Sequence, residues 1–425
     1  MHNNAFTMET VPLKFGWGVL GELGWDLKAL GVRRVLLLSD PHLAALGLLE
    51  RALEAIRAQG IELAVYDRVL CEPTDVSWQE AIDFANDAGP FDGFVALGGG
   101  SVIDTAKAVN LYTSYPAPIL DYVNKPVGGG KPVPGPLKPL VAIPTTAGTG
   151  SETTAVAVLD LLELELKAGV SSKLLRPRLA VIDPELTLSL PPAVTAACGM
   201  DILCHALESY TSLPFDQRPM PENPTLRPPY VGSNPVADIW AGQAIEIGAR
   251  YLPRAYRDPG DREAREWLML AATFAGMGFG NAGVHLPHAM SYPIAGMVHD
   301  FVPPGFPDDK VQVPHGMSVA LGTPASFRFI GGRAGEKTRA AFALLGGDPS
   351  AVGVDEAGAA VAERVAGIIR ELEMPNGLAA LGFSDADVPA LARGCAEQQR
   401  LLVNTPVPVT QADLEQVFRD AMTIW

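Results

Sequence analysis

Histidine and carboxylate side chains gather in the second half of the chain, where they could bind a divalent metal. Five of the seven histidines lie between residues 205 and 315. Asp201 and His205 are four residues apart in a helical pattern, so both side chains lie on one helix face and could share an ion. Imidazole with carboxylate is the donor mixture that borderline divalent metals accept. Spacing does not show which of the other histidines bind; these candidates are His285, His288, His299 and His315.

An uncharged stretch surrounds part of this histidine set. Residues 267–298 contain no Asp, Glu, Lys or Arg, and a helix of that length could span about 30 Å of hydrocarbon. The stretch also holds Asn281, two histidines and two prolines, whose polar or helix-breaking groups are costly in lipid. We therefore predict no transmembrane segment, and interpret the stretch as helices buried in protein around a polar site.

A run of glycines could bind a phosphate. An apolar strand at 94–97 leads into Gly98, Gly99, Gly100 and Ser101, and a helix begins at 102–107. Bare backbone N–H groups and the helix dipole at such a turn favour an anion. The alternative is a tight strand-to-helix turn that needs glycine for steric reasons. The pattern matches neither GxGxxG nor a P-loop, so alone it leaves both open.

A second polar loop follows another strand. The strand 140–143 is followed by PTTAGTGSE at 144–152, and ligands in open α/β sheets bind at the carboxyl ends of strands. Two such loops together favour a nucleotide cleft. Asp40, at the end of the strand 34–39, either accepts a hydrogen bond from a ribose hydroxyl or caps the helix that begins at Pro41.

The order of elements predicts two domains. Short buried strands alternate with helical patterns at 42–59 and 79–87, as in a parallel sheet covered by helices. After residue 190 the strand signals fade and helical patterns dominate. We expect an α/β domain at 1–190 and an all-helical domain at 191–425. The expected strands are 34–39, 62–66, 94–97, 140–143 and 179–182; the later helices are 193–212, 235–256, 261–280, 316–330, 352–372 and 411–424.

Composition excludes some functions. The 425 residues carry 32 Lys and Arg against 48 Asp and Glu, a formal charge of −16, whereas nucleic-acid and anionic-membrane binders need a basic surface. Anionic small molecules need only a local cation. The four cysteines show no CxxC spacing, which predicts neither disulfides nor a zinc ribbon. With no targeting signal recognised, we expect a cytoplasmic protein.

The motifs together resemble the iron-containing (group III) alcohol dehydrogenase family along essentially the whole chain. They occur in family order: FGWG at 15–18, LLLSDP at 36–41, GGGSVIDTAK at 98–107, PTTAGTGSE at 144–152, IDPELT at 182–187 and GMDILCHALESY at 199–210, followed by the segment 288–315. The resemblance implies an α/β fold with an N-terminal Rossmann-like parallel-sheet domain and a C-terminal all-α domain, as in dehydroquinate synthase.

The resemblance also implies roles for individual residues. The family's metal ligands fall on Asp201, His205, His288 and His315; His285 becomes a pocket residue or, alternatively, a ligand. The implied cofactor is NAD, which the acid at Asp40 favours over NADP, and the implied metal is Fe(II) ahead of Zn(II), although both suit three imidazoles and one carboxylate. The implied cofactor contacts are Asp40, Gly98, Gly99, Gly100, Ser101, Asp104, Thr145, Thr146, Thr149, Ser151 and Lys167.

One position departs from the family pattern. Many members carry a second histidine four residues after the one that matches His288, and here that residue is Tyr292. A proton-relay role assigned to that histidine would pass to Tyr292 or to a ribose hydroxyl. We include Tyr292 among the expected catalytic residues.

Within the family, the likeness is greatest to the hydroxyacid–oxoacid transhydrogenase subgroup. It is carried by the stretches 204–215, 221–240 and 278–296. That subgroup would oxidise 4-hydroxybutyrate to succinic semialdehyde and reduce 2-oxoglutarate with a cofactor that stays bound. Because both substrates carry carboxylates, we expect a cation in the pocket, with Arg218 and Arg227 as candidates.

Other functions remain open from the sequence. A plain NAD-dependent alcohol dehydrogenase acting on an alcohol or aldehyde would share the fold. Two alternatives belong to other functional classes. One is a metal- and NAD-dependent lyase or cyclase, and the other is a nucleotide-binding module without catalytic activity. The family resemblance also implies a homo-oligomer.

Overall fold

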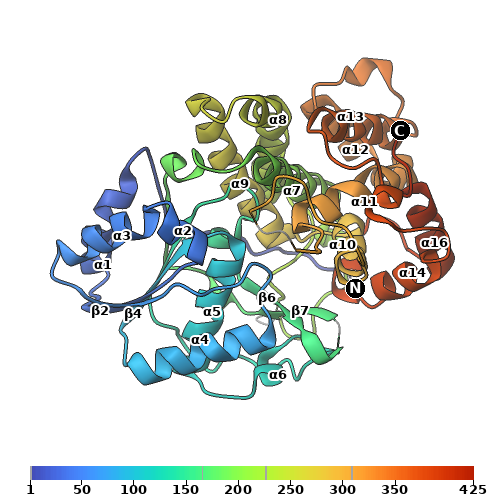
Figure 1. Cartoon of the computed structure of the whole chain (residues 1–425). Coiled ribbons are helices and arrows are strands. Elements are labelled where there is room, and N and C mark those ends of the chain that lie inside the picture. Colours follow the sequence, from blue (N-terminus) through green and yellow to red (C-terminus); the bar gives the residue numbers. More distant parts are fainter. Residues whose placement is uncertain (1, 165, 225–226, 308–309) are drawn as a thin grey trace. The chain divides into compact units, whose positions relative to one another are not determined.

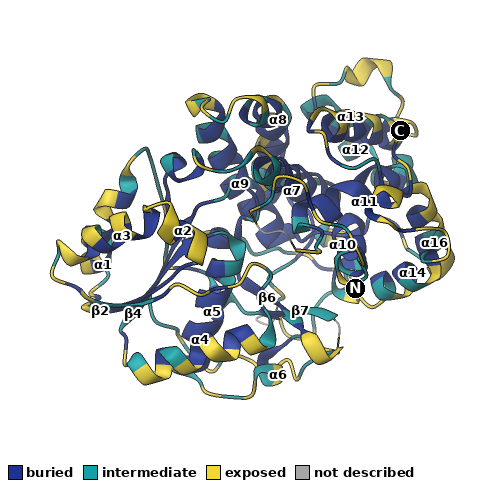
Figure 2. Cartoon of the chain, in the orientation of Figure 1, coloured by how far each residue is buried: buried dark blue, intermediate teal, exposed yellow. Residues whose placement is uncertain are grey.

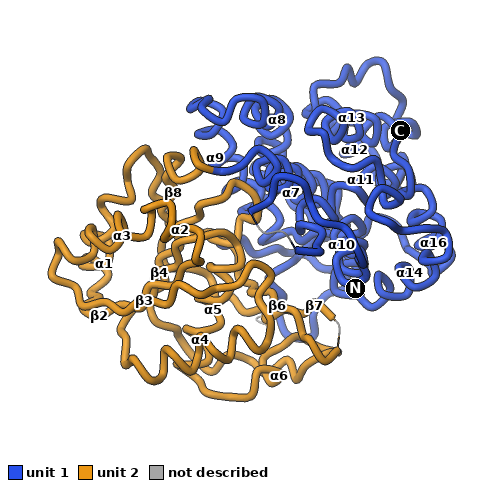
Figure 3. Tube along the Cα trace, in the orientation of Figure 1, with its two compact units in different colours: residues 1–9, 190–425 blue, residues 10–189 orange. Residues whose placement is uncertain are grey.

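The computed structural model describes residues 2–164, 166–224, 227–307 and 310–425 (Figure 1). Its internal contacts divide the chain into two compact units, which Figure 3 colours separately. The α/β unit spans residues 10–189. The helical unit contains residues 190–425 together with residues 1–9.

Six parallel strands form the centre of the α/β unit. Their order across the sheet is β1-β8-β5-β4-β2-β3, and each neighbouring pair is parallel. Of the five strands expected from the sequence, two have the observed bounds and three differ by one residue at an end or at both ends, while β1 was not expected. The strands are β1 (Leu13–Phe15), β2 (Arg34–Leu38), β3 (Glu62–Tyr66), β4 (Gly93–Gly98), β5 (Leu140–Pro144) and β8 (Leu179–Ile182).

Alternate residues of each central strand pack into two different cores. Val35 and Leu37 of β2 belong to the core beneath the first helices, and Leu36 and Leu38 belong to the core beneath the later ones, as the two-residue period of a strand requires. Figure 2 shows the strands buried beneath these helices. Helices α1 (Leu23–Ala29), α2 (Pro41–Ala45) and α3 (Leu48–Arg57) cover one face; α4 (Asp75–Ala88) and α5 (Gly100–Ser114) cover the other.

Three local features differ from the sequence expectations. The helix expected at 42–59 is two helices, because Gly47 takes a left-handed conformation with φ of 72° between α2 and α3. A short helix α6 (Ile119–Tyr122) lies within residues 116–139, whose seven prolines predict a loop. An antiparallel hairpin of β6 (Val156–Leu161) and β7 (Leu166–Ser171) was not expected, and its apolar residues join the core beneath α5.

The helical unit follows its sequence pattern closely. The six expected helices are all present, with ends shifted by up to five residues at 352–372. Four further helices were not assigned a range from the sequence: α10, α12, α14 and α15. The helices are α7 (Pro192–Thr211), α8 (Pro235–Arg257), α9 (Arg262–Ala282), α10 (Leu286–Gly296), α11 (His315–Ile330), α12 (Glu336–Leu344), α13 (Ala357–Glu371), α14 (Val388–Ala396), α15 (Gln399–Leu402) and α16 (Gln411–Asp420).

The chain start groups with the helical unit, whereas we expected it in the α/β domain. The backbone N–H of Asn3 donates to the carbonyl of Arg218 at 2.8 Å. Asn281 then holds Glu9 through two hydrogen bonds of 3.0 Å, one to its N–H and one to its carbonyl. The partners of residues 1–9 are more than 200 residues away along the chain. A domain boundary predicted from local sequence patterns therefore cannot include these contacts.

The uncharged stretch 267–298 forms the end of α9 and all of α10. Within the described residues, no single helix has the length and apolarity needed to cross a membrane. Helices α9 and α10 meet those criteria only as a pair, and that pair is bent by 103°.

Candidate active site

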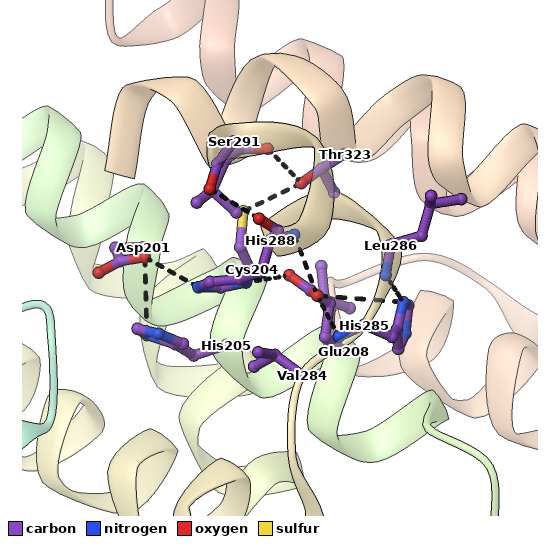
Figure 4. Close-up of polar contacts among 12 residues, drawn as sticks. Asp201, Cys204, His205, Glu208, Val284, His285, Leu286, His288, Ser291 and Thr323 are labelled. Atoms are coloured by element: carbon purple, nitrogen blue, oxygen red, sulfur yellow. Dashed lines mark hydrogen bonds and ion pairs between the residues drawn. The ribbon is translucent and has the colours of Figure 1, made fainter. Parts of the chain in front are cut away.

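Four predicted metal ligands lie together inside the helical unit, and Figure 4 labels three of them, Asp201, His205 and His288. One donor atom from each of Asp201, His205, His288 and His315 lies within 4.8 Å of the other three. From Asp201 Oδ1 the distances are 3.6 Å to His205 Nδ1, 3.7 Å to His288 Nε2 and 3.9 Å to His315 Nε2. The side chains come from three helices, α7, α10 and α11.

Helix α7 supplies a polar row within a buried helix. Asp201, His205 and Glu208 follow at intervals of four and three residues, so they lie on one face. All three are buried, with Glu208 fully so. The His205 ring stacks on Phe279 of α9 with ring centres 4.0 Å apart, and on His288 with centres 4.5 Å apart. Packing therefore fixes the orientation of the imidazoles before any ion arrives.

His315 is the first residue of α11, and close packing brings it to Asp201. At Gly316, a Cβ atom would lie 2.0 Å from the Ala197 carbonyl oxygen and 2.9 Å from Asp201 Cβ. Only a residue without a side chain permits this approach of α11 to α7. His315 keeps about 29% of its side chain exposed, so the cluster is open to solvent on that side.

Gly316→Ala is expected to push α11 away from α7. The overpacking should lower the free energy of unfolding by about 1–3 kcal/mol and weaken metal binding, because His315 moves with the helix. Denaturant unfolding and a metal titration measure the two effects. Gly367→Ala on α13 is the matched control, since its Cβ would meet nothing within 4 Å. Equal behaviour of the two variants would contradict the packing argument.

Glu208 organises the histidine segment, and the sequence analysis did not identify it. Its Oε1 accepts from His288 Nδ1 at 2.5 Å, and its Oε2 accepts from the backbone N–H of His285 at 2.6 Å and of His288 at 3.3 Å. Burial raises the pKa of Glu208 to about 7, while His285 and the two N–H donors oppose a larger rise. The spacing Asp201–His205–Glu208 on one helix face was the available sequence signal.

The contacts of His288 fit a metal ligand. Because Nδ1 is bonded to Glu208, the other ring nitrogen, Nε2, is the one that faces the cluster, and it is buried without a hydrogen bond. Burial, and then the positive charge of Arg400, lower the pKa of His288 to about 3, so the ring is neutral. A neutral imidazole with its second nitrogen bonded to a carboxylate is the usual form of a metal-bound histidine.

His285 and His299 lie outside the cluster. His285 Nδ1 accepts from the N–H of Leu286 at 2.8 Å and caps α10, and its Nε2 lies 3.1 Å from Thr211 Oγ1. Both ring nitrogens of His285 are therefore engaged, which favours the pocket role over the ligand role. His299 is exposed and is not part of the group.

Tyr292 stands one helical turn beyond His288 on α10. Its hydroxyl accepts from Arg400 Nη2 at 2.6 Å, and the guanidinium lies 5.5 Å from the ring centre. The residue that takes the place of the family's second histidine is thus paired with a cation. A proton-relay role for Tyr292 stays a prediction.

The two arginines proposed as carboxylate ligands lie in the loop before α8. Arg227 donates to the Asn3 side chain and to the Pro224 carbonyl. Arg218 donates from Nη1 to the Tyr230 carbonyl at 3.0 Å, and burial alone lowers its pKa to about 10. Both side chains therefore bond to the loop or to the chain start, and Nε and Nη2 of Arg218 are buried without a hydrogen-bond partner.

In the α/β unit, the two predicted cofactor loops lie against each other at the ends of β4 and β5. The N–H of Thr145 donates to the Gly98 carbonyl at 3.1 Å. A Cβ on Gly99 would lie 3.4 Å from Thr146 Oγ1, and one on Gly100 would lie 2.8 Å from Thr149. Helix α5 begins at Gly100 without a side-chain cap, so its first N–H groups are suited to an anion.

Several predicted cofactor residues hold the loops in place. Ser151 donates to Asp104 at 2.5 Å and accepts from the buried Lys107 at 2.8 Å, which ties the second loop to α5. Lys167 pairs with Glu72 at 2.6 Å and Asp160 at 2.8 Å, and the N–H of Glu72 donates to Ser101 at 3.2 Å. Direct contact of these residues with a cofactor stays a prediction.

Asp40 forms the helix cap that was one of its two expected roles. Its Oδ1 accepts from the N–H groups of His42 and Leu43 at 3.0 and 3.3 Å. Burial raises the pKa of Asp40, and these N–H donors oppose the rise. A hydrogen bond from a ribose hydroxyl stays a prediction, and Asp40 Oδ2 is the atom that would accept it.

Gly100→Ala is expected to separate the two loops, because Thr149 occupies the place of the new methyl group. We expect the dissociation constant for NAD to rise at least about tenfold, a change of about 1.4 kcal/mol. Calorimetric titration with NAD measures it. Gly21→Ala, whose Cβ would meet nothing within 4 Å, is the control. Unchanged NAD binding in Gly100→Ala would remove this turn from the cofactor site.

Comparison with known proteins follows the same division of the chain. A family model described as iron-containing alcohol dehydrogenase matches residues 12–184, and a model of the C-terminal part of the Fe-containing alcohol dehydrogenase family matches residues 230–422. The chain belongs to the iron-containing alcohol dehydrogenase family. This family implies NAD and a divalent metal, and the His and Asp cluster in α7, α10 and α11 provides a suitable donor set.

Within this family, the chain is similar over nearly its whole length to curated transhydrogenases. The mitochondrial hydroxyacid-oxoacid transhydrogenase of Homo sapiens is 47% identical over 423 residues, covering 99% of this chain and 90% of the relative. The Bos taurus protein of the same name is also 47% identical, covering 99% of this chain and 91% of its own.

Solved structures confirm the predicted fold class. A 1,3-propanediol oxidoreductase matches with a TM-score of 0.86 and 27% identity, covering 98% of this chain and all of its own. A sulfoacetaldehyde reductase from Bifidobacterium kashiwanohense, solved in complex with NAD+, matches with a TM-score of 0.81 and 26% identity, covering 99% of both chains.

Proposed function

We propose that this family member is a hydroxyacid–oxoacid transhydrogenase. The single observation that carries the proposal is the convergence of Asp201, His205, His288 and His315 within 4.8 Å, in a chain 47% identical to proteins of that name. The proposed reaction converts 4-hydroxybutyrate and 2-oxoglutarate to succinic semialdehyde and 2-hydroxyglutarate. One substrate loses the two electrons and two protons that the other gains, so no net oxidant is needed.

When bound, a divalent metal would polarise the substrate C–O bond and a nicotinamide would carry the hydride. The four clustered side chains would hold the metal. Glu208 accepts a hydrogen bond from His288 Nδ1, on the side of the ring away from the cluster, and so orients that ring. His285 caps the first turn of α10. Stacking of His205 between Phe279 and His288 limits the rotation of its ring. The chain therefore supplies a prearranged donor set, which is what metal-assisted polarisation requires.

We propose Fe(II) as the working metal, ahead of Zn(II). The family description supports iron, and one carboxylate with three imidazoles accepts both ions. Metal analysis of the isolated protein, followed by activity after reconstitution with each ion separately, tests this choice. Higher activity with Zn(II) at equal occupancy would reverse the assignment.

The proposed function is tested with the two substrates and no added NAD, on protein whose metal and nucleotide contents have been measured. A transhydrogenase should form succinic semialdehyde and 2-hydroxyglutarate in equal amounts over many turnovers. Oxidation of 4-hydroxybutyrate only when NAD is added, with stoichiometric release of NADH, would assign a plain alcohol dehydrogenase instead. Absence of any redox product under either condition would favour a lyase or cyclase.

A further inference from the structure

A cation of the helical unit is bonded to the helix that carries the metal ligand His288 and takes no part in the proposed reaction. Arg400 belongs to α15, which packs against α10. Its Nη2 donates to the hydroxyl of Tyr292, four residues after His288, at 2.6 Å. Four residues of helix advance about 6 Å, so the side chains of His288 and Tyr292 leave the same face of α10 one turn apart, and Arg400 contacts the hydroxyl end of Tyr292.

The charge of Arg400 is not balanced by an acid. Several other arginines of this unit pair with carboxylates, for example Arg254 with Asp261 and Arg419 with Glu415. Within the described ranges, Arg400 lies within ion-pair distance of no carboxylate, and its hydrogen-bond partner is a neutral phenol. It is also half-buried rather than fully solvated. A half-buried guanidinium without a counter-ion is suited to bind an anionic ligand.

A second contact holds the Arg400 segment against α10. Asn404, four residues after Arg400, donates from its Nδ2 to the Val284 carbonyl at 2.8 Å, directly before His285 and α10. The bonds from Arg400 and Asn404 therefore hold this segment along the helix that carries the metal ligand His288.

We propose that Arg400, positioned by Tyr292, binds the distal carboxylate that the two substrates share. This inference rests on the proposed function and adds to it the residue that selects acids over simple alcohols. The fork of N–H groups on a guanidinium matches the two oxygens of a carboxylate, and Tyr292 occupies only part of that fork.

Substrate chemistry explains how one cation could serve both half-reactions. In 4-hydroxybutyrate the reacting carbon is separated from the carboxylate carbon by two methylene groups. In 2-oxoglutarate two methylene groups likewise separate the reacting C2 from the distal carboxylate. One cation at a fixed distance from the reacting carbon therefore accepts both molecules. The second carboxylate of 2-oxoglutarate is attached to the reacting carbon itself and would lie at the metal cluster.

The arginines chosen from the sequence fit this role less well. Arg227 is bonded to Asn3 and Pro224. Arg218 keeps two buried donors, Nε and Nη2, without a hydrogen-bond partner, but its bonded donor, Nη1, holds it to the Tyr230 carbonyl within the loop. Arg400 is instead bonded to a residue of α10, the helix that carries the metal ligand His288.

The test uses Arg400→Gln in the metal-loaded full-length chain. The first measurement is kcat/KM for 4-hydroxybutyrate divided by that for 1-butanol, with NAD added. We expect this ratio to fall about 30-fold, mainly through KM, because one charged hydrogen-bonding group is lost. The second measurement is calorimetric binding of glutarate, an unreactive dicarboxylate, which should weaken by a similar factor at unchanged metal content.

Matched variants separate charge from packing. Tyr292→Phe removes the acceptor for Arg400 and should lower the same ratio by a smaller factor of about 3–10, since loss of a proton relay would lower kcat/KM for acid and alcohol alike and leave their ratio unchanged. It also carries the test if Arg400→Gln does not fold. Arg393→Gln on α14, an exposed arginine seven residues earlier, should leave the ratio unchanged.

Each outcome has a definite meaning. Equal loss for acid and alcohol in Arg400→Gln, or wild-type glutarate binding, would overturn the assignment. A selective loss in Arg218→Gln instead of Arg400→Gln would transfer the role to Arg218. Glutarate binding does not depend on turnover. If the wild-type chain fails the assay without added NAD while Arg400→Gln still weakens glutarate binding, the proposed function fails and the carboxylate site stands.

Discussion

Asp201→Asn is expected to leave the chain folded but without its metal, and to lower turnover at least about 1,000-fold, since metal polarisation contributes several kcal/mol. The substitution keeps the size of the side chain and removes its charge. Asp201 Oδ1 lies within 3.9 Å of one nitrogen of each of the three histidines, so it is the atom that all of them face. Metal analysis and the two-substrate assay on the same sample measure the effect.

Asp238→Asn is the control for this loss. Asp238 is a half-buried carboxylate of the same unit, and it pairs with Lys337 at 2.7 Å rather than with histidines. Its variant should retain full metal content. Full occupancy in Asp201→Asn would show that the ion, if any, is held elsewhere, and the four-residue cluster would lose its assigned role.

Glu208→Gln is expected to weaken metal binding by about 10–100-fold, the usual cost of removing a hydrogen-bond partner of a metal-bound histidine. The amide keeps one acceptor, but its NH2 group must face one of the N–H donors that Glu208 now accepts. The His288 ring then loses the charge that orients it. Competition with a chelator of known affinity gives the change in dissociation constant.

An exposed glutamate provides the comparison for this second substitution. Glu263 pairs with Arg254 on the surface, and Glu263→Gln should leave the metal dissociation constant as in the wild type. If Glu208→Gln binds metal as tightly as Glu263→Gln does, then the hydrogen bond to His288 serves only the packing of α10 on α7.

Local sequence patterns predicted much of the fold. The strands β2, β3, β4, β5 and β8 are short apolar runs bounded by turns, and helices such as α7 and α8 have long periodic patterns, so both kinds of element are legible without tertiary information. The hairpin β6–β7 was missed although β6, with the sequence VAVLDL, is a short apolar run, because β7 has a weaker pattern and the two strands form a sheet of their own outside the βα alternation. The grouping of residues 1–9 with the helical unit likewise depends on Asn281 and Arg218, far along the chain.

In the candidate site, too, some residues could be predicted from local sequence and others could not. The four-residue spacing of Asp201 and His205 predicts that they share a helix face, but the local sequence does not show which of His285 and His288 faces the cluster. Glu208 separates them, since it bonds the ring of one and the backbone of both. Arg400 lies far from His288 along the chain and is part of no motif. Its place next to Tyr292 is known only from the packing of α15 on α10.

The most direct measurement follows the transferred hydrogen. 4-Hydroxybutyrate carrying deuterium on its carbinol carbon is mixed with 2-oxoglutarate and the metal-loaded protein in ordinary water, without added NAD, and 2-hydroxyglutarate is analysed by mass spectrometry. The account predicts 2-hydroxyglutarate with one deuterium on C2, formed in equal amount with succinic semialdehyde. Unlabelled 2-hydroxyglutarate, or label that appears only in released NADH, would contradict it.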